Sequence, residues 1–303
     1  MVETNVIRWD DRYLQVLHRL GESSSRSTYE VKDHRSAMVY VRKTYYPRQT
    51  SCDHIKLALS TLKSSQDQAE ENLNVLRCHG VYLTDGPEKG VRAVFEYCEG
   101  GSLQSIGRVI AQRGGFIGEK VAARLAEGML QGLHYLSSLR MVHFNIQPSN
   151  VLISRSGIVK LSEPEIPGEG AAALTDRFAN SVRYASPERI RGHPANIYKS
   201  DIWAMGITLL ELVQNRYPYP EDLETVQLMV RIVEGHPPML QDRTEVIWGN
   251  RMKEFFRQTL SADEVQRPIA WELLAHPWIT GAMQQNVSME RWIAEVRGWP
   301  LRR

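Results

Sequence analysis

The sequence predicts an α+β protein, with a small antiparallel sheet in its first third and a larger helical part after it. Before residue 98, segments rich in β-branched and aromatic residues are separated by turn residues such as Asp85-Gly86-Pro87. From Gly101 onward, apolar residues recur at helical spacing. Strands followed by helices are typical of an α+β protein, and we expect the two regions to form two lobes.

The first lobe is predicted to hold five strands and one helix. The helix lies between Cys52 and Gln66, where Ile55, Leu59 and Leu62 form one apolar stripe. The predicted strands are Tyr13–Leu20, Ser27–Val31, Ala37–Val41, Gly80–Leu83 and Arg92–Tyr97.

The second lobe is predicted to be mainly helical. The clearest helices are Lys120–Ser138, Ser200–Gln214, Leu223–Glu234, Trp248–Leu260 and Ala270–Ala275. We expect one domain in all, in which residues 1–98 form the first lobe and its connection, 99–280 the second lobe, and 281–303 a C-terminal helix.

The composition excludes several classes of function. At 303 residues with 42% hydrophobic side chains, the chain is long enough for a sizeable core. Its 37 Lys and Arg nearly balance 35 Asp and Glu, and no basic block stands out, so neither nucleic acid nor a membrane is an expected partner.

The cysteines and the apolar runs indicate the compartment. Three cysteines without C-x-x-C spacing (Cys52, Cys78 and Cys98) argue against a disulfide framework or a zinc site and fit a reducing compartment. The longest apolar run, Ile202–Leu210, is far shorter than a membrane span, and the charged start does not resemble a signal peptide. We expect a cytoplasmic protein that could also enter the nucleus.

Five motifs in a fixed order carry the strongest functional signal. They are His143–Asn150, Val159–Glu165, Ser186–Glu188, Ser200–Gly206 and Gln266–Pro268. Together they resemble the catalytic loop, the D-F-G region, the A-P-E motif, the D-x-W-x-x-G helix and the late Arg of eukaryotic protein kinases. The resemblance covers roughly residues 10 to 280 and implies a bilobal kinase-like fold with an αC-type helix in the small lobe.

Within that superfamily the chain most resembles the MAP kinase kinases. The segments that carry this resemblance are Trp9–Tyr13, Val41–Lys43, Glu99–Leu103, Tyr184–Arg189, Asn215–Pro220 and Leu274–Ile279. Few residues precede the first predicted strand, where that family carries an extension that docks its MAP kinase, so docking of that kind is not expected. Residues 289–296 resemble the C-terminal helix that docks an upstream kinase kinase kinase in that family, although a helix that only closes the second lobe is an equal alternative.

The catalytic positions implied by the resemblance hold unusual residues. The family's loop reads H-R-D-x-K-P-x-N, and here Asn145 replaces the Asp that accepts the substrate proton while Gln147 replaces the Lys that steadies the γ-phosphate. An amide cannot act as a general base near neutral pH. No Asp or Glu occurs from Gly128 through Ser162 that could replace it locally.

The residues that would bind the nucleotide and its metal are also altered. Lys43 matches the strand lysine of the family, and its helix partner, normally Glu, is Ala58. Glu163 replaces the metal-binding Asp with a longer carboxylate, and Pro164 should lock the turn that follows it. Of the Gly-rich turn between the first two strands, only Gly21 remains.

The activation segment, Glu163–Glu188, departs from the family in a related way. Phe144 replaces the loop Arg that helps to receive phosphate, and an Ala-rich stretch replaces most hydroxyl residues, although Thr175 and Ser181 remain. We therefore expect a segment that phosphate no longer switches.

From these substitutions we expect a pseudokinase without catalytic residues or a metal site, acting as a scaffold or allosteric partner in a MAP kinase cascade. The alternatives are a nucleotide-binding switch without phosphotransfer and a weakly active, atypical serine/threonine kinase. Cofactors are not expected, except ATP with or without Mg²⁺ in these alternatives. The residues that would contact nucleotide are Gly21, Lys43, Glu96, Cys98, Asn150 and Glu163.

The resemblance also implies structural charges and partners. Glu188, Asp201 and Arg267 should be buried charges that are paired or hydrogen-bonded. The expected partners are kinases of a MAP kinase cascade, including an upstream kinase kinase kinase bound through residues 281–303.

Overall fold

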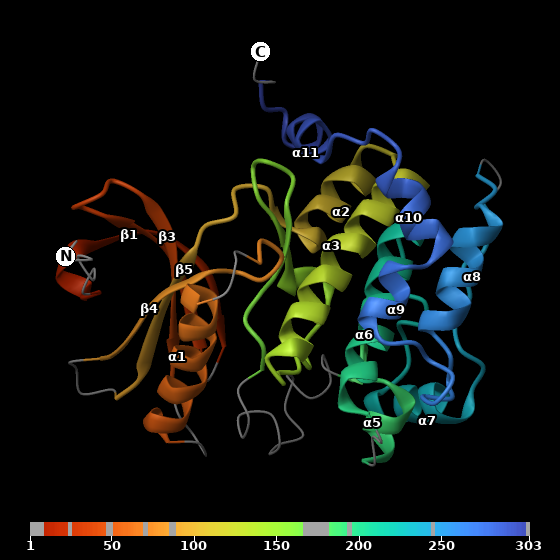
Figure 1. Ribbon diagram of the computed structural model, residues 1–303, viewed down its shortest axis with the longest axis horizontal. Coiled ribbons are helices and arrows are strands. Elements are labelled where there is room, and N and C mark those ends of the chain that lie inside the picture. Colours follow the sequence, from red (N-terminus) through yellow and green to blue (C-terminus); the bar gives the residue numbers. More distant parts are fainter. Residues whose placement is uncertain are drawn as a thin grey trace. The chain divides into compact units, whose positions relative to one another are not determined.

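The computed structural model describes residues 9–23, 26–46, 51–68, 72–84, 89–165, 182–192, 196–243 and 246–300. These residues form two compact units (Figure 1). The first unit holds the described residues up to 72 together with those from 76 to 97. The second holds residues 73–75 and the described residues from 98 to 165 and from 182 to 300.

The first unit is an antiparallel sheet with a helix beside it. Its elements are β1 (Leu14–Ser23), β2 (Arg26–Asp33), β3 (Val39–Tyr45), α1 (Cys52–Gln68), β4 (Cys78–Leu83) and β5 (Val91–Glu96). The strand order is β1-β2-β3-β5-β4, and every neighbouring pair is antiparallel. The predicted sheet and helix are therefore confirmed.

Helix α1 is attached to the sheet by an apolar stripe and by one buried amide. Ile55, Leu59 and Leu62 are buried at helical spacing, as the sequence predicts. Gln66 is buried one turn further on, where its Nε2 donates to the Leu76 carbonyl at 3.0 Å. Because its Oε1 also accepts from a backbone N–H of β4, a polar side chain fits here without an unpaired group.

A single carboxylate ties together three strands of this sheet. Asp11, in the 3₁₀ turn Asp11–Tyr13, accepts a hydrogen bond from Arg42 of β3 at 2.9 Å and from the Tyr82 hydroxyl of β4 at 2.8 Å. It also pairs with Arg92 of β5. These contacts attach the 3₁₀ turn Asp11–Tyr13 to the sheet.

The second unit combines a short antiparallel sheet, ordered β6-β7-β8, with helices. Its strands are β6 (Gly101–Ser102), β7 (Val151–Ile153) and β8 (Val159–Leu161). Its helices are α2 (Leu103–Gln112), α3 (Glu119–Ser138), the 3₁₀ turn η2 (Pro148–Asn150), α5 (Pro187–Arg191), α6 (Ile197–Gln214), α7 (Thr225–Glu234), α8 (Asn250–Thr259), α9 (Ala270–Leu274), α10 (Pro277–Met283) and α11 (Met289–Arg297).

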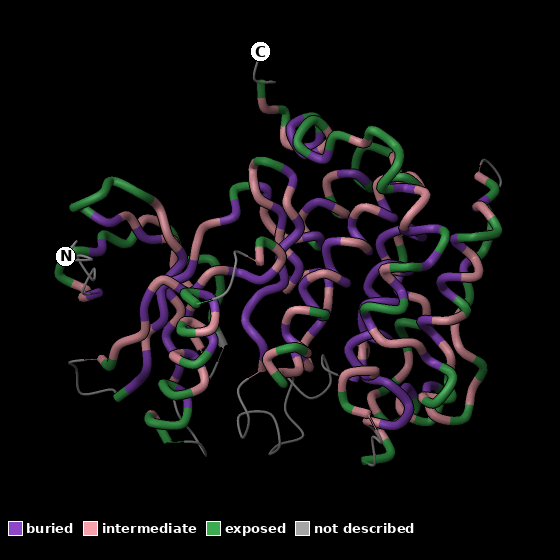
Figure 2. Tube along the Cα trace, in the orientation of Figure 1, coloured by how far each residue is buried: buried purple, intermediate pink, exposed green. Residues whose placement is uncertain are grey.

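Helix α6 forms the core of the second unit. Every residue from Ser200 to Leu210 is buried (Figure 2). Helices α2, α3 and α8 pack on it. A helix that is apolar all round requires such cover, which is why the longest apolar run of the sequence lies here. None of the helices in the described ranges is long and apolar enough to cross a membrane.

Several boundaries differ from the prediction for local reasons. Ala37 lies in a turn with φ +58°, so β3 begins at Val39 rather than at residue 37. The strand continues to Tyr45, which places Lys43 inside it and not at its end. Helix α2 was not predicted, although the Ser102 side chain caps it by accepting from the Ser105 N–H. Helix α10 was missed too, and it begins at Pro277, the residue type that is favoured in a first turn.

Candidate active site

A buried carboxylate on α6 holds the backbone of the catalytic loop. Asp201 accepts hydrogen bonds from the N–H groups of His143, at 2.7 Å, and Phe144, at 2.8 Å. Phe144 has a φ of +57°, a left-handed conformation that is uncommon for a bulky residue. Burial raises the pKa of Asp201 to about 6, although the two N–H donors favour its charged form.

The buried pair between Glu188 and Arg267 connects α5 with the segment before α9. Arg267 donates to the Glu188 carboxylate through Nη1 at 2.7 Å and Nη2 at 3.1 Å, and its side chain is fully buried. Burial would raise the pKa of Glu188, but the hydrogen bonds from Arg267 hold it below its usual value. Such a pair persists only because each remaining donor is satisfied, here by the carbonyls of Lys199 and Ser261.

The tip of the catalytic loop is a network of neutral amides. Oδ1 of Asn145 accepts from Nε2 of Gln147 at 2.7 Å, and the Asn145 carbonyl accepts from Nδ2 of Asn150 at 2.8 Å. All three residues are half-buried. The substitutions therefore replace charged groups by amides that bond to each other and keep the loop folded.

Glu163 lies two residues after the end of β8 and is buried. The Ser162 N–H donates to the Asn150 carbonyl at 2.9 Å, so the segments that carry Asn150 and Glu163 are neighbours. The ring nitrogen Nε2 of His143 lies 3.1 Å from the Ser162 carbonyl. The structure thus brings His143, Asn150 and Glu163 together in the second unit.

The oxygen atoms of Asn150 and Glu163 are of the kind that binds a magnesium ion carried by a nucleotide. Mg²⁺ prefers oxygen ligands and usually takes one or two from the protein, with phosphates and water supplying the others. The Glu163 carboxylate and the Asn150 amide oxygen have that chemistry. The described ranges contain no group of three or more His, Cys, Asp and Glu side chains that could hold a metal without a nucleotide.

In the first unit, Lys43 lies on β3 opposite Ala93 of β5. Its Nζ is 5.5 Å from the centroid of the buried Phe95 ring, within the range of a cation–π contact. Ala58 is half-buried on α1, where it offers no carboxylate. Gly21 lies within β1 rather than in a turn, and a Cβ at this position would meet nothing within 4 Å.

Glu96 and Cys98, two of the residues expected to contact nucleotide, already use part of the hydrogen-bonding capacity of their backbone groups. The Glu96 N–H donates to the Arg77 carbonyl at 3.0 Å, so this N–H is engaged within the first unit. The Cys98 carbonyl accepts from the Gly101 N–H at 2.9 Å within the second unit. Of the activation segment, residues 166–181, with Thr175 and Ser181, lie outside the described residues.

Helix α11 closes the second unit with an apolar face. Met289, Ile293, Ala294 and Val296 are buried. Arg297 fixes the end of the helix by donating to the Gly100 carbonyl at 2.6 and 2.9 Å. Helix α11 therefore packs on the second unit, while its role stays a prediction.

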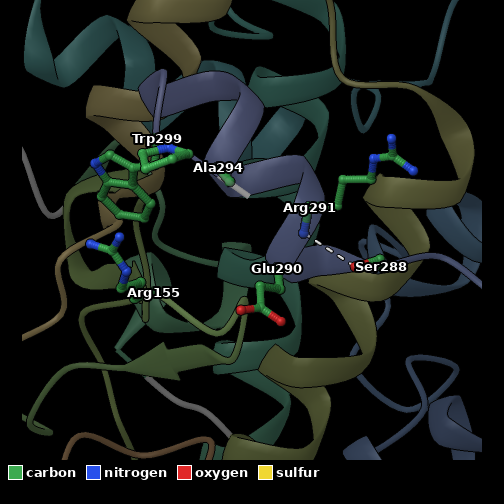
Figure 3. Close-up of a pocket in the computed structure, with 7 residues that line it drawn as sticks. Arg155, Ser288, Glu290, Arg291, Ala294 and Trp299 are labelled. Carbon is green, nitrogen blue, oxygen red and sulfur yellow. Dashed lines mark hydrogen bonds between the residues drawn. The ribbon is translucent and has the colours of Figure 1, made fainter. Parts of the chain in front are cut away.

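A cavity of about 330 Å³ borders the exposed face of α11. Its walls include Glu290 and Arg291 of the helix. Figure 3 shows Arg155 next to Trp299, and the guanidinium carbon of Arg155 is 4.8 Å from the Trp299 ring centroid. The cavity wall therefore presents charged groups and an aromatic ring.

Comparison with known proteins agrees with this arrangement. The protein kinase domain matches residues 14–279. The chain is 37% identical to the mitogen-activated protein kinase kinase mkk1 of Cytospora mali over 75% of this chain and 44% of that protein. It is 30% identical to the MAP kinase kinase MKK1/SSP32 of Saccharomyces cerevisiae over 92% of this chain and 56% of that protein. The MAP kinase kinase skh1/pek1 of Schizosaccharomyces pombe is also 30% identical, over 92% of this chain and 77% of that protein.

The chain therefore belongs to the protein kinase family, and the predicted kinase-like fold is confirmed. Within that family its relatives are MAP kinase kinases, as the motifs predicted. The chain spans about half the length of several of the curated relatives that it matches.

The prediction that the chain is not an enzyme is wrong, because the relatives are named as kinases. The physical reason lies in what single residues contribute. Loss of a general base commonly lowers a rate by about two to four decades and does not abolish it. Losses of residues that act together are not additive. Replaced residues at Asn145, Gln147, Glu163 and Ala58 are therefore insufficient grounds to deny activity.

Proposed function

We propose that this chain is an atypical protein kinase of the MAP kinase kinase type, which transfers phosphoryl groups slowly to serine or threonine hydroxyls. The observation that carries the proposal is the intact backbone frame of the catalytic loop, in which Asp201 holds the N–H groups of His143 and Phe144. Phosphoryl transfer depends mainly on positioning and electrostatic stabilisation, because its transition state is loose. A chain that keeps the frame keeps much of what this reaction requires.

The loop residues of this chain would act as hydrogen-bonding groups rather than as charges. ATP supplies the transferred group, and the bound Mg²⁺ neutralises its charge. Asn145 cannot take a proton, but its Oδ1 has a second lone pair and can accept a hydrogen bond from the attacking hydroxyl. Gln147 offers a neutral N–H donor where the family has a cation. The hydroxyl proton is then left to water, which lowers the rate.

Each unit by itself offers residues that are proposed to contact the nucleotide. In the first unit, Lys43 offers a cation and Gly21 an unobstructed backbone. In the second unit, Asn150 and Glu163 offer oxygen ligands on neighbouring segments. Glu96 and Cys98 are proposed to contribute backbone groups, and the Glu96 N–H and the Cys98 carbonyl each make a hydrogen bond within their own unit.

A phosphotransfer assay tests this proposal. The purified chain would be incubated with γ-labelled ATP, Mg²⁺ and a MAP kinase as acceptor, beside Lys43→Met and the matched control Lys32→Met on the neighbouring strand β2. We expect slow labelling by the wild type and by Lys32→Met, and none by Lys43→Met. Equal labelling by the wild type and Lys43→Met would refute the proposal.

A nucleotide-binding switch without phosphotransfer is a separate outcome. Thermal unfolding with and without Mg-ATP detects it, because a ligand bound only by the native state raises the midpoint. A raised midpoint that Lys43→Met abolishes, together with absent labelling, would establish the switch in place of the kinase.

The proposed setting is a MAP kinase cascade, with an upstream kinase kinase kinase as a partner at residues 281–303. The names of the relatives and the exposed face of α11 support this proposal. Deleting α11 would expose its buried face, so surface variants are the better test. We expect Arg291→Glu and Trp299→Ala to weaken capture of that kinase, while Gln284→Glu, which lies before the helix, leaves it unchanged. Unaltered capture by both variants would exclude this face.

A further inference from the structure

Phe144 requires more support than one carboxylate provides. Its left-handed backbone is strained for an aromatic residue, and such conformations persist only where the surroundings fix them at several points. Asp201 fixes the N–H side of this residue at 2.8 Å. Its carbonyl and its ring are fixed by another residue, to which the sequence analysis assigned no role.

That residue is Arg189, on α5. Its Nη1 donates to the Phe144 carbonyl at 2.7 Å. Its guanidinium carbon lies 4.6 Å from the centroid of the Phe144 ring, in the position of a cation–π contact. One side chain therefore fixes both the backbone and the ring of Phe144.

Glu165 completes the arrangement from the other side. Its carboxylate pairs with Nη2 of Arg189 at 3.5 Å, and its backbone N–H donates to the His143 carbonyl at 2.9 Å. The side chains of Arg189 and Glu165 are 29% and 19% exposed, so the pair is only partly screened by water. His143, Phe144, Arg189 and Glu165 thus form a closed ring of contacts over Asp201.

We propose that Arg189 and Glu165 are a positioning pair that keeps the catalytic loop ordered without any added phosphate. Resting on the proposed kinase function, this inference identifies how the loop is held for catalysis. Phosphorylation orders a segment when it gives an arginine an anionic partner. Here the anion is a carboxylate of the chain itself, so Arg189 has its partner permanently. Neither residue touches the reacting groups.

Hydrogen exchange of the peptide 141–150 tests this pair directly. We expect Arg189→Met to speed exchange of this peptide about three- to tenfold, because it removes one hydrogen bond, one cation–π contact and one ion pair. Glu165→Gln should give a smaller increase, and Arg189→Lys an intermediate one. Arg191→Met is the matched control, since Arg191 lies on the same helix and donates to the Val233 carbonyl instead.

Phosphatase treatment and kinetics complete the test. Treating the wild type with phosphatase should leave exchange of this peptide unchanged, and Arg189→Met should lower kcat with KM for ATP unchanged. Unchanged exchange in Arg189→Met, or faster exchange in the phosphatase-treated wild type, would overturn the pair. If Arg189→Met does not fold, Glu165→Gln and Arg189→Lys decide. If no variant and no wild type transfers phosphate, the proposed function fails, whereas exchange still decides on the pair.

Discussion

Two regions of the second unit differ in electrostatic character. The buried frame, Glu188, Asp201 and Arg267, consists of charged side chains that are almost completely buried. The loop tip, Asn145, Gln147 and Asn150, consists of neutral amides that are half-buried. In both regions the polar groups are hydrogen-bonded.

The difference separates two properties that a catalytic loop normally combines. The frame fixes where the backbone lies, and charges serve this purpose because a buried carboxylate can hold two N–H groups at once. The tip determines which groups face the reacting atoms, and there the charge has been lost. The backbone conformation of the loop and the charge at its tip therefore depend on different residues. Variants can change the charge and leave the conformation unaltered, or the reverse.

The largest effect is expected from breaking the frame. Arg267→Met leaves Glu188 buried without its cation, and loss of one partner of a buried pair costs about 3–5 kcal/mol. The free energy of unfolding, from denaturant titration, measures this. Arg257→Met is the control, because Arg257 is exposed and pairs with Glu254 at the surface, where water screens the pair and its contribution is small. Equal losses of unfolding free energy in both variants would show that the buried pair contributes no more stability than a surface pair.

Restoring charge at the tip should raise activity without affecting the fold. Asn145→Asp supplies a general base, worth about two decades in rate or more, and Nε2 of Gln147 can still donate to the new carboxylate. The initial rate of phosphotransfer measures the gain, and Asn145→Ala is the matched control that cannot act as a base. A rate that stays at the wild-type level in Asn145→Asp would mean that the base is not what limits the reaction.

The pH dependence of stability should differ in sign between the intact and the broken frame. The pKa of Glu188 is lowered in the native state, so its contribution is present at neutral pH and is lost as pH falls through the lowered pKa. In Arg267→Met the hydrogen bond from the Ser200 hydroxyl remains, but burial without the cation should raise the pKa of Glu188, so that variant should gain stability as pH falls. The unfolding midpoints of the wild type and of Arg267→Met should therefore approach each other as pH is lowered from 7 to 4. Parallel curves for the two proteins would contradict this account.

The smallest effect is expected at the link between Asn150 and the loop. Asn150→Ala removes the hydrogen bond to the Asn145 carbonyl, which is worth about 1 kcal/mol because water replaces part of it. Thermal unfolding detects the loss, with Asn150→Asp as a variant that keeps the size but not the donor. A loss of stability as large as that of Arg267→Met would mean that the loop tip contributes as much to stability as the buried charges do.

Much of the fold follows from periodicity in the sequence. The stripe of Ile55, Leu59 and Leu62 predicts the buried face of α1, and the apolar run 202–210 predicts the core helix. Local backbone conformations are harder to predict from the sequence. Ala37 takes a positive φ, and this delays β3 although the sequence reads as a strand. Tertiary contacts decide such positions, because a single residue has no periodicity.

The site residues stay a prediction, whereas the prediction that the chain is not an enzyme is wrong. Motif spacing indicates Lys43, Asn150 and Glu163, because the family fixes them relative to one another. The contact between Arg189 and Glu165 joins residues that no motif connects, and only the folded chain shows it. The prediction of an inactive protein failed because residue types show which groups are present, while a rate depends on how far the remaining groups compensate.

The contact between α11 and the β7–β8 turn links two segments of the second unit that are far apart in the sequence. Gly157, in that turn, has a φ of +82°, and a Cβ there would collide with the backbone of Met289 and Glu290. The first turn of α11 and this turn are thus in direct backbone contact. The strand β7 runs from this turn to Asn150, and β8 runs from it to Glu163. Any shift of the first turn of α11 would therefore press on the β7–β8 turn, whose two strands lead to the segments that carry both candidate metal ligands.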